Sequence, residues 1–147
     1  MRRTRLCLPL LCALGACATP TAARPLLGAD LDEVRARLGA PIACSHGGGT
    51  WLLTYRGADG APIDEAVVVI DGVVVAVDPR ARPNTATDPE SRWLAASVDE
   101  VVRELGSGAV RSRGMGGTVA QFGDLELRFA DGRVAAAAPI AGAAAGR

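Results

Sequence analysis

The strongest constraint on this chain is an internal repeat. Residues 29–39 return as residues 96–106, displaced by 67 positions. After one insertion the correspondence resumes at a displacement of 60 positions, which pairs Asp71-Gly72 with Asp131-Gly132. Self-similarity of this kind predicts that one supersecondary unit is present twice and that both copies share a fold.

Each copy opens with the signal of a short amphipathic helix. In the first copy Asp30 is followed three positions later by Glu33, which forms a capping box, and apolar residues then recur at helical spacing until a glycine. In the second copy Ser97 and Glu100 form the box, and a glycine again ends the run. Both helices have only about two turns, fewer than the roughly 12 to 15 residues that an isolated helix needs in water, so each must pack on a sheet.

Three strands are expected after each helix. Apolar alternation and two-residue turns predict strands at 51–55, 66–70 and 73–77 in the first copy, and at 118–122, 125–130 and 133–137 in the second. The segment between the helix and the first strand of each copy is interpreted as a connection. The predicted fold class is therefore α+β, with two tandem units, 26–78 and 93–138, that each contain a helix and a three-stranded antiparallel meander.

The amino end has the pattern of a lipoprotein export signal. Residues 1–16 combine three arginines, a short apolar run and small residues, and the run is too short to span a bilayer as a mature helix. Leu14-Gly15-Ala16-Cys17 resembles the lipobox of bacterial lipoproteins, which implies that Cys17 is lipidated and anchors the mature chain to a membrane. The alternative is ordinary signal cleavage, for example after Ala23. Each acyl chain adds about 0.8 kcal/mol per buried methylene, so several chains anchor a protein stably.

Three further segments lie outside the two units. Residues 17–25 are predicted to be a flexible tether, because they combine prolines with small residues and have no periodicity. Residues 79–92 contain three prolines and are interpreted as a linker. Residues 139–147, mostly alanine and glycine, are predicted to be a disordered tail.

The charge and the cysteines exclude some classes of protein. The chain of 147 residues is 49% hydrophobic, and its 16 basic and 16 acidic residues balance, so nothing in its charge favours nucleic acid as a partner. If the signal is removed, only Cys17 and Cys44 remain. A lipidated Cys17 leaves Cys44 unpaired, which excludes a disulfide scaffold.

The two predicted sheets differ in the face turned away from the helix. In the second copy this face carries Glu126, Arg128 and Arg133, as expected of a surface in contact with water. In the first copy the same alternation places only apolar residues there, namely Ala66, Val68, Ile70, Val73, Val75 and Val77. Soluble proteins rarely leave such patches bare, so two interpretations stay open. Either the linker, the tail or the other repeat covers the face, or a partner protein binds it.

No group of residues predicts a catalytic site or a metal site. Cys44 lies close in sequence to His46, the sole histidine, but neither further ligands at metal spacing nor an orienting third group accompany them. The glycine run 47–49 lacks the ending of a phosphate-binding loop. Asp64 and Glu65 are adjacent in an extended segment and would point to opposite sides. We therefore expect no enzymatic activity, no cofactor, no metal and no small-molecule substrate.

Short motifs resemble a known family. Residues 27–34, the Leu-Gly-Ala-Pro break at 38–41, and Trp51 and Tyr55 on a strand resemble the SmpA/OmlA (BamE-like) small outer-membrane lipoproteins. That resemblance implies a helix packed on a sheet and a part in assembling outer-membrane β-barrels. The tandem plan is similar to that of β-lactamase inhibitor protein, in which two helix-and-sheet halves bind an enzyme.

These observations predict a non-enzymatic lipoprotein that acts through contacts with an envelope protein, in outer-membrane assembly or maintenance. It would be exported and anchored through Cys17, on the periplasmic face of the outer membrane if the cell is Gram-negative. One alternative is an inhibitor that seats a secreted or periplasmic enzyme on the sheet or on the hairpin 57–65. The least favoured alternative is a thiol enzyme that uses Cys44.

Overall fold

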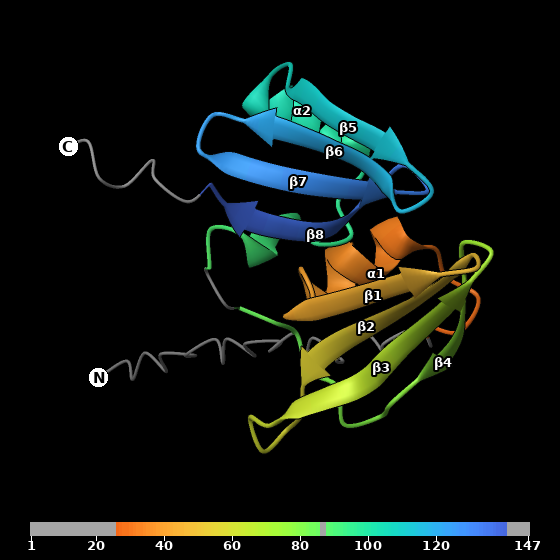
Figure 1. Cartoon of the computed structure of the whole chain (residues 1–147). Helices are drawn as coiled ribbons and strands as arrows, with labels where there is room; N and C mark the ends of the chain where they lie inside the picture. The colour runs from red at the N-terminus through yellow and green to blue at the C-terminus, as the bar shows by residue number, and fades with distance from the viewer. Residues whose placement is uncertain (1–25, 86–87, 141–147) are drawn as a thin grey trace, which may run out of the picture.

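The computed structural model describes residues 26–85 and 88–140, which form two successive α–β units (Figure 1). The first unit consists of α1 (Leu31–Leu38), β1 (Ala43–Gly47), β2 (Thr50–Arg56), β3 (Pro62–Ile70) and β4 (Val73–Val77). A 3-10 helix, η1 (Ser91–Trp93), precedes the second unit. The second unit consists of α2 (Val98–Leu105), β5 (Ala109–Gly114), β6 (Gly117–Phe122), β7 (Leu125–Ala130) and β8 (Arg133–Pro139).

The expected fold class is wrong, because each sheet contains four strands and the protein is mostly antiparallel sheet with two short helices. In both sheets the strands follow chain order, and neighbouring strands are antiparallel. The strands that the pattern missed are β1 and β5, whose sequences, ACSHG and AVRSRG, have little β-propensity. They are strands because they pair with β2 and β6, and the residues of β1 and β5 alone do not indicate that pairing.

Both helices begin where the capping boxes predict. The Asp30 carboxylate accepts a hydrogen bond of 2.8 Å from the Glu33 backbone N–H. The Ser97 hydroxyl accepts one of 3.2 Å from the Glu100 backbone N–H. A glycine follows each helix with a φ of 74° or 79°, a left-handed conformation that glycine adopts without steric cost. The helix predictions are therefore confirmed.

The last hairpin of each unit has the same turn and the same irregularity. Asp71-Gly72 and Asp131-Gly132 have positive φ at both positions, as a type I′ turn requires. Shortly after each turn the register shifts, and the extra residue is Val75 in β4 and Ala135 in β8. Because a bulge sets two residues opposite one, side chains beyond it face the other way from strict alternation.

Each unit has its own hydrophobic core between its helix and its sheet. In the first unit α1 buries Leu31, Val34 and Leu38 against the sheet. The β2 side chains beneath it are Trp51, Leu53 and Tyr55, which are at most 3% exposed. The core of the second unit contains Trp93, Leu94, Ala96, Val101, Ala120, Leu127, Phe129 and Val134.

The two units dock through different surfaces. Strand β8 of the second unit lies beside α1 and β1 of the first (Figure 1). The Arg133 guanidinium donates to both oxygens of the Asp32 carboxylate, at 2.7 and 2.9 Å, and Arg35 pairs with Glu100. Because the last strand of one copy meets the helix and first strand of the other, the contact is head to tail, and among the described residues the equivalent surfaces at the two ends do not take part in it.

Candidate functional site

Four of the six apolar residues predicted to face away from the helix lie on the outer side of the first sheet. Ile70, Val73 and Val75 are 42%, 47% and 48% exposed, and Val68 is partly buried. These four residues are called the β3–β4 patch below. The hairpin turn at Asp71-Gly72 brings the two strands of the patch together.

The positions paired with Val68 and Ile70 of the β3–β4 patch on β2, and with Val68 on β4, are uncharged. On β2, Leu52 is paired with Val68, and Thr50 is paired with Ile70. On β4, Ala76 is paired with Val68. Within residues 26–85 and 88–140, neither the linker nor the second unit covers the patch, as its exposure shows. In the described part of the chain, the patch is therefore covered neither by the linker nor by the other repeat, two of the segments that the first interpretation proposed as cover.

Ala66 and Val77 do not belong to this face, which corrects the sequence-based assignment. Ala66 is fully buried, and Val77 packs against the core of the first unit. A register shift between β2 and β3, together with the positive φ of 55° at Glu65, precedes Ala66. The bulge residue Val75 precedes Val77. Each irregularity interrupts the alternation on which the prediction depended.

In the second unit, the surface equivalent to the β3–β4 patch is already a docking surface. Val75 corresponds to Ala135, which is 6% exposed and packs into the core of the first unit. Val73 corresponds to Arg133, which pairs with Asp32. The bulged end of the last hairpin thus holds the two units together in one copy and is exposed in the other.

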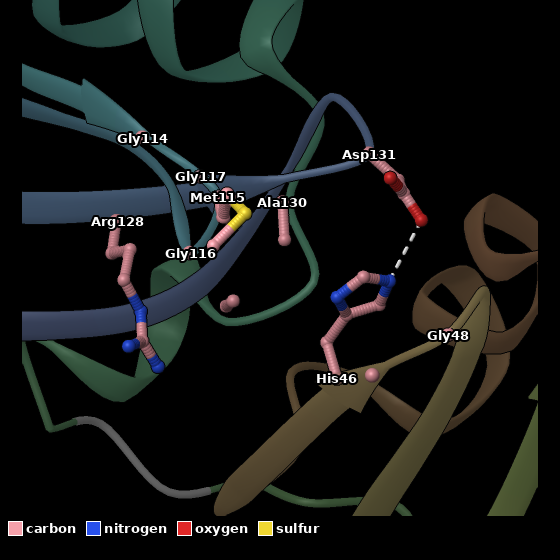
Figure 2. Close-up of a pocket in the computed structure, with 11 residues that line it drawn as sticks. His46, Gly48, Gly114, Met115, Gly116, Gly117, Arg128, Ala130 and Asp131 are labelled. Atoms are coloured by element: carbon pink, nitrogen blue, oxygen red, sulfur yellow. Dashed lines mark hydrogen bonds and ion pairs between the residues drawn. The ribbon is translucent and has the colours of Figure 1, made fainter.

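A cleft of about 320 Å³ lies between the two units, beside the β1–β2 and β5–β6 turns (Figure 2). In it His46 Nε2 is 2.7 Å from Asp131 Oδ2, and the His46 ring packs on Trp51 with 4.6 Å between the ring centroids. The remaining lining residues are Gly47, Gly48, Gly114, Met115, Gly116, Gly117, Arg128, Ala130 and Ala135. None of them carries a hydroxyl or thiol that a histidine could activate. The His46–Asp131 pair therefore connects the two units, and the described lining of the cleft contains no side chain that would serve as a nucleophile.

Cys44 lies on β1 and faces the second unit, whereas the sequence pattern placed it in a loop. Its thiol donates to the Ala135 carbonyl oxygen, with 3.2 Å between Sγ and O, and it packs against both cores. Burial raises the pKa of the Cys44 thiol to about 11. Because the thiolate is the nucleophilic form, this environment disfavours thiol catalysis.

The described residues offer no site for a metal. Among residues 26–85 and 88–140, no three His, Cys, Asp or Glu side chains are placed to share an ion. The part of the chain that the structure describes also has no helix with the length and apolar character to cross a membrane. Cys17, the predicted lipidation site, lies outside the described residues, so its modification stays a prediction.

The structure therefore defines a tandem protein of two four-stranded α–β units, with an exposed apolar patch on the outer face of the first sheet. Comparisons with protein-family models, curated proteins and solved structures find no match to this chain. Its function must be inferred from its own surfaces.

Proposed function

We propose that this protein is a non-enzymatic lipoprotein of the cell envelope that binds another protein through the β3–β4 patch. The observation that carries the proposal is the exposure of Ile70, Val73 and Val75 on a part of the sheet face whose paired neighbours on β2 and β4 are uncharged. Apolar surface removed from water contributes about 25 cal/mol per Å², so a matching apolar surface gains free energy by covering the patch. Contiguous apolar patches that are exposed on a protein surface commonly mark sites of interaction with another protein or a membrane.

The contact between the two units indicates what kind of partner fits. In the second unit, the equivalent surface receives α1 and the edge strand β1, with Cys44 against Ala135. The partner that we propose is an envelope protein that presents an apolar helix-and-edge-strand surface. The first copy has Val73 where the second has Arg133, so a partner of the patch needs no carboxylate equivalent to Asp32.

Lipidation of Cys17 would hold this surface near a membrane. The described fold begins at Leu26, nine residues after Cys17, and an extended tether of that length reaches roughly 30 Å. The patch would then work close to the anchoring leaflet, which is the periplasmic face of the outer membrane if the cell is Gram-negative. The resemblance of residues 27–34 and 38–41 to SmpA/OmlA lipoproteins supports a role in outer-membrane assembly or maintenance.

Site-specific photo-crosslinking in intact cells tests the protein contact. A benzoylphenylalanine at Val73 should crosslink to one envelope protein, and the same group at Arg128, the position equivalent to Val68 on the second sheet, should not. Adding Val75→Asp to the Val73 probe should abolish the adduct, and should change the free energy of unfolding by no more than about 0.5 kcal/mol because the side chain is exposed. Equal adducts at both probe positions, or an adduct that survives Val75→Asp, would refute the proposal.

The anchor has a separate test. Cells grown with labelled palmitate should label the wild-type protein, and Cys17→Ser should lose both the label and the membrane association. A Cys17→Ser protein that still carries palmitate would remove the lipid anchor from the proposal and leave the protein contact standing.

Inhibition of a secreted enzyme is a second candidate function, favoured by the β2–β3 turn. The Gly57 N–H donates to the Ala61 carbonyl at 2.7 Å, and the Ala61 N–H donates to the Asp59 carboxylate at 3.0 Å. A projecting turn that is already ordered loses little entropy when it enters an enzyme cleft. A benzoylphenylalanine at the exposed Ala58 should then capture a hydrolase, whereas the first proposal predicts no adduct there.

A further inference from the structure

Helix α2 covers the second sheet incompletely. Val101 is fully buried, but Val98, Val102 and Leu105 are 38%, 43% and 39% exposed. A pocket of about 380 Å³ opens between the helix, β5 and the inner face of the sheet. Its apolar lining includes Val98, Val102, Val110, Ala120, Phe122 and Phe129.

The repeat explains why the pocket exists. Trp51 and Leu53 of β2 fill the space beneath α1 in the first unit, and their equivalents on β6 are Thr118 and Ala120. Phe129 recovers part of the lost volume, because it stands where the first copy has a valine. The remaining volume is the pocket.

The end of α1 is also held by a tyrosine hydrogen bond that the second copy cannot form at the end of α2. The Tyr55 hydroxyl donates to the Gly39 carbonyl at 2.9 Å, and Asn84 of the linker donates to two more carbonyls at the end of α1. Phe122 replaces Tyr55 in the second copy and has no hydroxyl. Val102 replaces the charged Arg35, so the side of the pocket that the helix forms is apolar.

We propose that this pocket binds an uncharged hydrocarbon group, either an acyl chain or an aromatic ring system. Val98, Val102 and Val110 give it an aliphatic side, and Phe122 and Phe129 meet edge to face, with 6.3 Å between their ring centroids. Asp131, the charged residue in its described lining, is engaged by His46. The volume lies near the lower end of the range of about 300–1,000 Å³ that is common for ligand sites, which fits one chain or one ring system.

The test uses the neutral fluorescent probe N-phenylnaphthylamine and the purified chain in buffer without detergent. We expect saturable enhancement of fluorescence. Ala120→Leu fills the pocket from the sheet, with the residue that the first copy has at Leu53, and Val102→Phe fills it from the helix. Each should weaken binding by about tenfold or more, because the probe must then compete with a side chain for the same volume. The melting temperature reports whether each variant is folded.

A matched control separates this pocket from the β3–β4 patch. Val73→Asp charges the patch and should leave probe binding unchanged. Competition by methyl laurate would identify an acyl chain as the occupant, whereas competition by naphthalene alone would identify an aromatic ligand. The proposal is overturned if the wild-type chain gives no saturable enhancement, if binding persists in both folded filling variants, or if only Val73→Asp abolishes it.

Discussion

The first unit exposes valine and isoleucine on the outer face of its sheet, whereas the second unit exposes valine around its helix and carries charge on its outer face. The two copies nevertheless share their strand order, their helix caps, their last hairpin turn and the bulge after it. Exchanges of a few side chains on one backbone plan therefore decide which surface stays apolar. A duplicated protein can acquire two different exposed apolar surfaces in this way, with little change to the scaffold.

The largest difference between the copies should be the tightness of their cores. Leu53 is completely buried, so Leu53→Ala should lower the free energy of unfolding by about 2–5 kcal/mol through lost contacts and the cavity that remains. The opposite exchange at the equivalent position, Ala120→Leu, should not destabilise the protein, because the pocket has room for the side chain. Urea denaturation of both variants measures the contrast, and an equal loss in both would mean that the second core is as full as the first.

A smaller effect should come from the hydrogen bond that the Tyr55 hydroxyl donates to the Gly39 carbonyl at the end of α1. Tyr55→Phe gives the first copy the residue of the second and leaves the Gly39 carbonyl without its partner, which should cost about 1–2 kcal/mol. Amide hydrogen exchange should rise at the end of α1 toward the rate in α2. Phe122→Tyr serves as the control, since an added hydroxyl at the partly exposed ring should change stability by no more than about 0.5 kcal/mol. Unchanged exchange in Tyr55→Phe would show that the Tyr55 hydrogen bond does not hold the end of α1.

The smallest effect concerns the docking of the two units and depends on pH. The hydrogen bond from Arg133 lowers the pKa of the Asp32 carboxyl below its ordinary value of 3.8. A carboxylate with a lower pKa in the folded state stabilises the protein above the unfolded pKa, and this contribution disappears as the pH falls through the folded pKa, below about 4. Because the Asp32 side chain is 66% exposed, Asp32→Asn should cost well under about 1 kcal/mol at neutral pH.

Denaturation of the wild type and Asp32→Asn across the acid range measures this contribution. The stability difference between the two proteins should shrink as the pH falls below the ordinary carboxyl pKa of 3.8. A difference that stays constant with pH would mean that the charge of Asp32 contributes nothing to docking.

The elements that the pattern predicted correctly depend on neighbours in sequence. Asp30 and Ser97 begin the helices, and Asp71-Gly72 closes a two-residue hairpin, because caps and turns are decided within a few residues. Strand β1 was missed for the opposite reason, since a strand poor in β-formers depends on its partner. Of the six residues predicted for the outer face, Ala66 and Val77 were misassigned because irregular pairing changes which side a residue faces.

The contacts between the two units were beyond any local pattern. Arg133 and Asp32 are 101 positions apart, and His46 and Asp131 are 85 positions apart. The repeat itself points to two of these four residues, because the copies differ there. Arg133 stands where the first copy has Val73, and His46 stands where the second copy has Arg113. The pattern could single out these positions, but only the docked units identify their partners.

The sequence by itself determined the duplication, the two helices with their caps, and the hairpin turns that bring the strands together, because each depends on short-range spacing and backbone preference. Tertiary structure alone decided the fourth strand of each sheet, the burial of Ala135 against the exposure of Val75, and the pocket beneath α2. These features depend on which side chains meet across long separations, and side-chain volume and burial are properties of the packed state.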